Sequence, residues 1–259
     1  MQCIAKLLGL GNQYKVIGDI GRYRVPNVAI LRSMVQYPSL LSTVVSEVSS
    51  EFQNPNCSEY TFHIITMSIS DAKDIAKMLN NRDILSMSLH SECTKDERQD
   101  IMRKWNNNKL KVLVSTIHDG IDSSQCKHVY IVGGSHNNMA LLQSIGRIRP
   151  RQQSGSNAKV KIYDTDYPGV DDNSEEDDER FIQSLIGAGL VGNDNRDKAS
   201  HILTDLFTRK GYKVLVDTDE CLRKELLMKI DVDSDVCGMC SSSMKTMESS
   251  KEVYNEWLH

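Results

Sequence analysis

The 259-residue sequence contains no apolar run close to the ~20 residues that a membrane-spanning helix needs. Its first residues, MQCIAKLLGLGNQYK, are too short and too polar for a secretory signal peptide. We therefore expect a protein of the nucleus or cytoplasm that has no membrane partner. Aromatic residues are scarce, at 6%, but 39% hydrophobic and 25% charged residues are typical of a globular fold with a real core.

The sequence also lacks the even set of cysteines that a disulfide framework requires. Its seven cysteines are at positions 3, 57, 93, 126, 221, 237 and 240, and only the last three are clustered. An odd number in a chain without a visible export signal argues against structural disulfides.

There is no excess of positive charge, since the formal net charge is −4. Seven of the acids, however, fall in one run, DDNSEEDDER, at 171–180, which we interpret as a solvated linker or loop. Without this run the chain has 30 basic and 28 acidic residues. The overall charge therefore neither supports nor excludes a nucleic-acid partner.

Between residues 60 and 165, short β-branched runs alternate with helical patterns. Helices are predicted at 70–79, 94–105 and 137–146, the second of which opens with a capping-box pair, Thr94 and Glu97. Strands are predicted at 61–66, 84–90, 111–116, 128–133 and 159–164. This alternation indicates an α/β fold in which helices cover a parallel sheet. After the acidic run, helices are predicted at 181–190, 198–212 and 220–230.

Ligands of open parallel sheets bind beyond the carboxyl ends of the strands. The predicted strands place Thr66, His90, Thr116 and Gly133 along that edge, beside the start of the helix at 137–146. A histidine in such a place is more often satisfied by the backbone than used as a ligand.

Three arginines gather in the stretch QSIGRIRPRQ, at 143–152. A helix that carries Gln143 and Arg147, with Arg149 and Arg151 in the turn after it, presents several guanidinium groups to one phosphate chain. The alternative is a basic helix end that complements its own dipole.

Several segments resemble, in order, the second RecA-like lobe of superfamily 2 helicases. QSIGR resembles motif VI, Q-x-x-G-R, and TIHDGID resembles a shortened motif V. FHIITMSISDAKDIAKML is similar to the strand and helix of motif IV. The resemblance is closest to RecQ-like DNA helicases, because IAKLLGLGNQYKVIGDIGRYRVPNV is similar to their inter-lobe segment and ECLRKELLMKIDVDSDVCGMC to their zinc-binding segment.

The resemblance implies four parts. These are an inter-lobe connecting segment at 1–28, a RecA-like C-terminal lobe at 29–168, an acidic linker at 169–180 and a small, mostly helical, degenerate zinc-binding subdomain at 181–259. It also implies an ATP-dependent 3′–5′ DNA helicase that acts in recombination and repair, with single-stranded or duplex DNA as its partner.

Residue roles follow from the same resemblance. Gln143 and Arg147 are expected near the terminal phosphates of ATP, and either Arg149 or Arg151 as an arginine finger, because the family's second arginine position is Pro150 here. Gly120 and Asp122 are expected to contact the nucleotide, Asp122 at the ribose. Thr116, Thr66 and His90 are expected to contact the DNA backbone.

The sequence has no G-x-x-x-x-G-K-[ST] phosphate loop and no acidic box for magnesium. ATP and Mg²⁺ are therefore expected to be shared with a first lobe, and we expect no useful ATP turnover by this chain alone. A piece of a longer helicase, a lobe that works with a partner chain, and a decayed copy that only binds nucleic acid all remain open. So does an unrelated metabolic nucleotide-binding domain.

Cys237 and Cys240 form a C-x-x-C pair sixteen positions after Cys221. Closed zinc sites normally have four ligands, and the position of the family's next cysteine is Ser243 here. A Zn²⁺ site with His201 or His259 as fourth ligand, a weaker three-cysteine site, and a redox or chance pair remain open.

Overall fold

The computed structural model describes residues 28–55, 60–116, 121, 126–145, 158–165, 180, 183, 204 and 209–217. The chain divides into two compact units. The first comprises residues 27–135 and 140–169 and contains the β-sheet. The second comprises residues 1–26, 136–139 and 170–259. Its described part includes helix α8, Arg209–Asp217.

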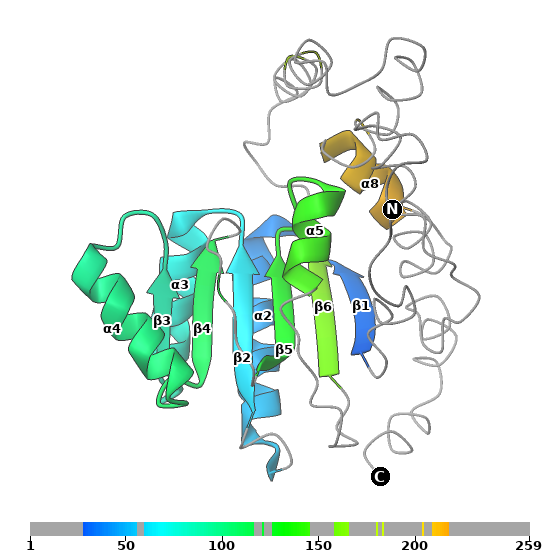
Figure 1. Cartoon of the computed structure of the whole chain (residues 1–259). Coiled ribbons are helices and arrows are strands. Elements are labelled where there is room, and N and C mark those ends of the chain that lie inside the picture. The colour runs from blue at the N-terminus through cyan, green and yellow to red at the C-terminus, as the bar shows by residue number, and fades with distance from the viewer. Residues whose placement is uncertain are drawn as a thin grey trace, which may run out of the picture. The chain divides into compact units, whose positions relative to one another are not determined.

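Among the residues that the structure describes, six strands form one sheet in which all neighbouring pairs are parallel. They follow the spatial order β1-β6-β5-β2-β4-β3 (Figure 1). Their bounds are Val28–Met34 (β1), Thr61–Thr66 (β2), Ser86–Leu89 (β3), Val112–Thr116 (β4), Cys126–Val132 (β5) and Ala158–Asp164 (β6). The predicted α/β fold with a parallel sheet is therefore confirmed, and the carboxyl ends of all six strands meet at one edge.

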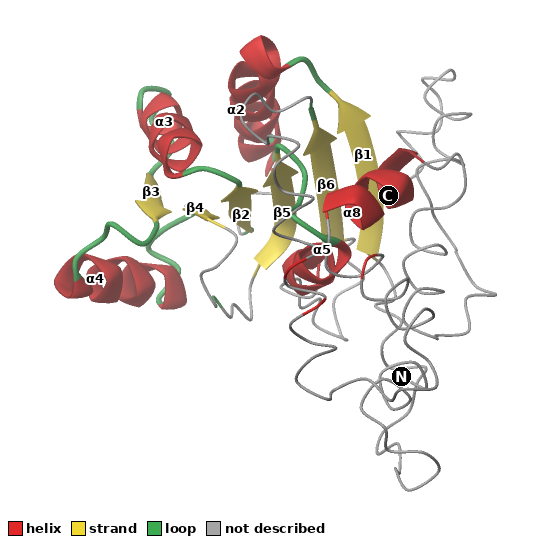
Figure 2. Ribbon diagram, turned by 90° about the horizontal axis from the view of Figure 1, so that it is seen from above, coloured by secondary structure: helices red, strands yellow, loops and turns green. Residues whose placement is uncertain are grey.

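Helices cover both faces of this sheet (Figure 2). Helices α2, Tyr37–Gln53, and α3, Ile69–Asn80, lie on one face. Helices α4, Lys95–Asn106, and α5, Asn138–Ile145, lie on the other. No helix among the described residues is long and apolar enough to cross a membrane.

Helix α4 shows how a local sequence signal sets a boundary. Thr94 Oγ1 accepts a hydrogen bond from the Glu97 backbone N–H at 3.3 Å, and Glu97 Oε2 accepts one from the Thr94 N–H at 2.8 Å. This is the capping box predicted from the sequence, and it satisfies two backbone donors that a helix start would otherwise leave open. The helix then buries Ile101 and Trp105 against the sheet.

The element α2 and the strand before it were not predicted. The α2 sequence, YPSLLSTVVSEVSSEFQ, is rich in serine and valine, which favour a helix only weakly. Leu40, Val44 and Val48 nevertheless recur on one helical face and are fully buried. They pack with Phe62, Ile64 and the apolar side of α3 into the main core, so packing rather than local propensity decides this helix.

Few residues of the three helices predicted after the acidic run are described by the structure. The helix predicted at 198–212 overlaps α8 at residues 209–212, and Thr204 is also helical. The helix predicted at 220–230 and nearly all of that at 181–190 lie outside the described residues.

Candidate functional site

The carboxyl edge of the sheet brings together the strand ends predicted to carry the site. Thr66, at the end of β2, is in register with Thr116 of β4 on one side and with Val132 of β5 on the other. Gly133 follows Val132 directly. His90 follows Leu89 of β3, which is in register with Ser115 of β4. The four predicted positions therefore lie along one edge.

The side chains at this edge differ in accessibility. Thr66 is fully buried, and its Oγ1 donates to the carbonyl oxygen of Ser68 at 2.9 Å. The His90 side chain is also buried. The backbone carbonyl oxygen of His90 accepts hydrogen bonds from the Arg98 guanidinium at 3.0 Å and from the Cys93 N–H at 3.1 Å. Thr116 is only half-buried. Of these three residues, Thr116 has the side chain best placed to meet a ligand.

A two-glycine turn leads from β5 toward α5. Gly133 and Gly134 have φ angles of 82° and 80°, in the left-handed region where a Cβ would be strained. Both of their N–H groups donate to the carbonyl oxygen of Tyr163, at 2.9 and 3.0 Å. The turn is thus fixed to the neighbouring strand β6, and it gives the chain a defined direction at the carboxyl edge.

Helix α5 exposes the glutamine of the QSIGR segment. Leu141, Ser144 and Ile145 are buried, whereas Gln143 is exposed. Gln143 is therefore available to a ligand or to another lobe. The other residues predicted for the site lie outside the described residues; they are Arg147, Arg149, Arg151, Gly120 and Asp122. Ile121, between the last two, is buried.

Sequence reasoning missed a polar pair beneath the edge. His63 Nε2 lies 2.8 Å from Ser115 Oγ, and both side chains are 1% exposed. The only local signal is a histidine inside the apolar strand TFHIIT. Nothing in the sequence selects Ser115 as its partner, because the two residues are 52 positions apart.

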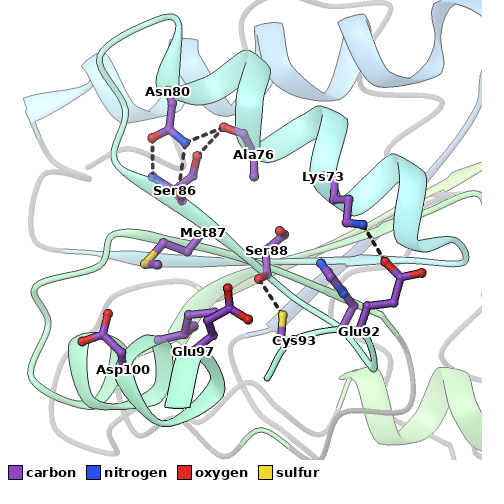
Figure 3. A pocket seen from close by; sticks show the side chains of 12 residues that line it. Lys73, Ala76, Asn80, Ser86, Met87, Ser88, Glu92, Cys93, Glu97 and Asp100 are labelled. Atoms are coloured by element: carbon purple, nitrogen blue, oxygen red, sulfur yellow. Dashed lines mark hydrogen bonds and ion pairs between the residues drawn. The ribbon is translucent and has the colours of Figure 1, made fainter. Parts of the chain in front are cut away.

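A groove of about 520 Å³ runs beside β3, between α3 and α4, and His90 contributes to its lining (Figure 3). Its charged side chains are engaged with neighbours. Glu92 Oε2 contacts Lys73 Nζ at 2.6 Å, and Asp100 contacts Arg103 at 2.5 Å and Lys104 at 2.6 Å. Hydrogen bonds to the Thr94 backbone and side chain lower the pKa of Glu97.

Charged side chains on the face of the sheet that α2 covers connect this helix to the strands. Glu51 contacts His128 of β5 and Lys159 of β6, and Glu47 contacts Lys161. Burial alone would raise the pKa of Glu51, but the close contact with His128 and the charge of Lys159 outweigh it and lower the pKa from 4.5 to about 2. Lys159 and His128 lie near the amino ends of their strands, away from the carboxyl edge. This network holds the fold together and is not part of the candidate site.

Within the described ranges, no three His, Cys, Asp or Glu side chains are grouped so that they could hold a metal ion. Neither Cys93 nor Cys126 forms a disulfide. The zinc ligands expected from the sequence, Cys221, Cys237 and Cys240, lie outside the described residues.

Comparison with known proteins gives this geometry a family context. Residues 48–150 match the family described as the helicase conserved C-terminal domain. This part of the chain is similar to a helicase second lobe. The match begins in α2 and ends in the QSIGRIRP segment, so it spans the carboxyl-edge residues described above.

A curated protein that is similar to part of this chain is also named as a helicase. A protein of Sulfolobus islandicus filamentous virus (isolate Iceland/Hveragerdi) named "Putative helicase 22" is 25% identical over 122 residues, which is 46% of this chain. The chain spans only 21% of the length of that relative.

Solved structures of DEAD-box proteins are also similar. Domain 2 of the helicase Mss116p, solved with an RNA duplex, gives a TM-score of 0.46 at 15% identity and covers 64% of this chain and 60% of that one. A DEAD-box protein from Methanococcus jannaschii gives 0.46 at 16% identity, over 67% of this chain and 42% of that one.

Proposed function

We propose that this chain is the second lobe of a nucleic-acid-dependent motor of the helicase type, and that ATP and Mg²⁺ bind between it and a first lobe. The match of residues 48–150 to the helicase C-terminal domain carries this proposal. The segment TIHDGID begins at Thr116, the last residue of β4, and QSIGR begins in α5, the helix that comes after β5. The carboxyl ends of β4 and β5 share one edge, where α/β sheets bind ligands.

In this proposal the arginines act on phosphate. Arg147 contacts the terminal phosphates of ATP, and Arg149 or Arg151 acts as the arginine finger that stabilises charge on the transferred phosphoryl oxygens. Gln143, which is exposed on α5, orients groups near the nucleotide. Asp122 binds the ribose, and the Gly120 backbone lies close to the nucleotide.

The nucleic acid is proposed to lie over the β2, β4 and β3 ends. Thr116 contributes its half-buried hydroxyl, while Thr66 and His90, whose side chains are buried, contribute through the backbone around them. Contacts of this kind position a phosphate backbone without reading bases, so we expect little sequence preference.

The finer assignment is a RecQ-like DNA helicase with 3′–5′ polarity that acts in recombination and repair. It is supported by the similarity of residues 4–28 to the RecQ inter-lobe segment and of residues 220–240 to the RecQ zinc-binding segment. In the same proposal Cys221, Cys237 and Cys240 bind Zn²⁺. The acting protein includes a first lobe, either in the same polypeptide or as a partner, because this sequence contains no phosphate-binding loop.

A second candidate is a non-catalytic nucleic-acid-binding or regulatory module. The absence of the phosphate loop and of the acidic box from the sequence favours it. Both candidates bind a nucleic-acid backbone, and they differ in whether a first lobe restores catalysis.

Two measurements test the proposal. Anisotropy of a labelled single-stranded oligonucleotide, titrated with the full chain at several salt concentrations, should show weak binding that decreases steeply with salt. ATPase is then assayed after addition of a RecQ-like first lobe that carries the phosphate loop. DNA-stimulated turnover by the pair supports the motor, and binding without turnover supports the non-catalytic module. Absence of salt-dependent binding contradicts both.

A further inference from the structure

We infer that His63 and Ser115 form a buried positioning pair that holds the start of the segment STIHDGID in the geometry needed to grip a nucleic-acid backbone. The inference rests on the function proposed above, because that function gives Thr116, the next residue, a phosphate to contact. It assigns a role to a histidine that the helicase resemblance leaves without one.

The pair connects three elements inside the lobe. His63 lies in β2 and Ser115 in β4, with Nε2 and Oγ 2.8 Å apart. On the same side the His63 ring tilts against Trp105 of α4, with ring centroids 6.1 Å apart. A change at His63 is therefore transmitted both to α4 and to the end of β4.

The backbone of Ser115 also lies against β2, in register with Ile65. Thr66 Oγ1 lies 3.5 Å from the Ser115 carbonyl oxygen, so β2 contacts both the side chain and the backbone of this one serine. Thr116 comes directly after Ser115, ends β4, and is in register with Thr66. Strand β2 therefore fixes the position of Thr116 through its contacts with Ser115, the residue before it.

The chemistry of the pair favours positioning over stability. Imidazole and hydroxyl groups are costly to bury, and a buried hydrogen bond recovers little more than that cost, so two apolar side chains of similar shape would be about as stable. A hydrogen bond, unlike apolar packing, fixes a distance and a direction. The apolar strand TFHIIT keeps this polar residue where it sets the end of the neighbouring strand.

The test uses the full 259-residue chain with His63→Leu, Ser115→Ala, the double variant, and His63→Gln. Hydrogen exchange of the peptide that contains Thr116 measures how firmly the end of β4 is held. Anisotropy of a labelled oligonucleotide at low salt measures the affinity for nucleic acid. Each single variant should speed exchange at Thr116 and weaken binding, both by about five- to tenfold, the size expected from one hydrogen bond. The double variant should be no weaker than either single variant, because both remove one shared contact. His63→Gln, which retains a hydrogen-bonding side chain, should recover most of the binding.

Matched controls separate positioning from general stability. Ser49→Ala removes another buried serine, whose Oγ donates to Val45 O at 2.6 Å on α2. His128→Leu removes another buried histidine near the amino end of β5. Both should leave exchange at Thr116 and oligonucleotide affinity unchanged at temperatures where the variants are folded.

Two results would overturn the inference. One is unchanged exchange at Thr116 in His63→Leu. The other is a loss of binding that merely follows the fraction of unfolded protein and that His63→Gln does not reverse. If the unmodified chain binds no oligonucleotide, the proposed function fails, whereas the exchange data still decide whether the pair positions Thr116.

Discussion

Glu51 Oε2 on helix α2 lies 3.0 Å from His128 Nδ1 on strand β5, and the other oxygen of the same carboxylate contacts Lys159 on β6. One turn earlier on α2, Glu47 contacts Lys161 and accepts a hydrogen bond from the Tyr163 hydroxyl, each at 2.5 Å. Two carboxylates on one helical face thus meet two lysines on one strand face, which fixes α2 across the sheet.

This arrangement predicts that the fold is sensitive to acid. Because the pKa of Glu51 is lowered from 4.5 to about 2, its stabilising effect is complete above the unfolded pKa, near 4.5, and is lost as pH falls toward about 2. Partial exposure reduces the contribution, which we expect to be about 1–3 kcal/mol. Glu51→Gln should lower the free energy of unfolding at neutral pH and flatten its decrease below pH ~4.5, as measured by urea denaturation.

Glu92→Gln is the matched control, since Glu92 is an exposed carboxylate paired with Lys73. It should change the unfolding free energy less than Glu51→Gln does. Equal effects of the two substitutions would show that the buried network contributes no more to the free energy of unfolding than an exposed ion pair does.

Arg147→Ala is expected to abolish DNA-stimulated ATPase of the chain combined with a first lobe. The proposed function places the fixed positive charge of Arg147 beside the transferred phosphoryl group, and such a charge contributes about 10³-fold or more to the rate of phosphoryl transfer. Circular dichroism should be unchanged. Arg149→Ala and Arg151→Ala, assayed side by side, should identify the finger as the variant with the larger decrease in turnover. Full activity in Arg147→Ala would refute the motif VI assignment.

Asn80→Ala is expected to destabilise the outer edge of the sheet. The Asn80 amide donates to the carbonyl oxygens of Ala76 and Ser86, both at 2.9 Å, and its Oδ1 accepts from the Ser86 N–H at 3.0 Å (Figure 3). The side chain thereby substitutes for a neighbouring strand at the first residue of β3. Its loss should cost about 1–2 kcal/mol and increase aggregation on heating, because an open edge strand can pair with another chain.

The adjacent Asn81→Ala tests whether the effect is specific. Asn81 is exposed at the end of α3, where its backbone N–H makes the capping contact. Thermal denaturation and light scattering should therefore stay close to those of the unmodified protein. A similar loss in both variants would indicate a general effect of the helix end.

The cysteine proposal predicts bound zinc. The purified protein should contain zinc by elemental analysis, and Cys237→Ser and Cys240→Ser should each remove most of it, because a three-thiolate site has no ligand to spare. Cys93→Ser, which changes a cysteine beside β3, should leave the zinc content unchanged. A metal-free protein purified without chelators would contradict the proposal.

The sequence predicted those elements whose signals are local. The strand at 61–66 has the predicted bounds, and the capping box of Thr94 and Glu97 placed the start of α4. Strand β3 is shorter than predicted, Ser86–Leu89 rather than 84–90. At its start the Ile84 N–H donates to the Leu79 carbonyl oxygen at the end of α3, and after its end the His90 carbonyl oxygen accepts a hydrogen bond from the Cys93 N–H, so these residues belong to turns.

The elements that were missed depend on distant partners. Strand β1 is defined by its pairing with β6, and α2 by the burial of Leu40, Val44 and Val48 against the sheet. The same holds for the site. The strand ends were placed from short-range alternation, but the His63–Ser115 pair forms only when β2 and β4 lie side by side.

The pairing of β1 with β6 has a consequence for the protein during its synthesis. Val28 is in register with Ala158, 130 positions later, so at one edge of the sheet the first of the described strands pairs with the last. Contacts at such a separation form late, since a long loop must close before they give any stability. During synthesis on the ribosome, β1 therefore cannot pair until β6 has been translated. Until Asp164 has emerged from the exit tunnel, the nascent chain carries an incomplete sheet that chaperones can recognise.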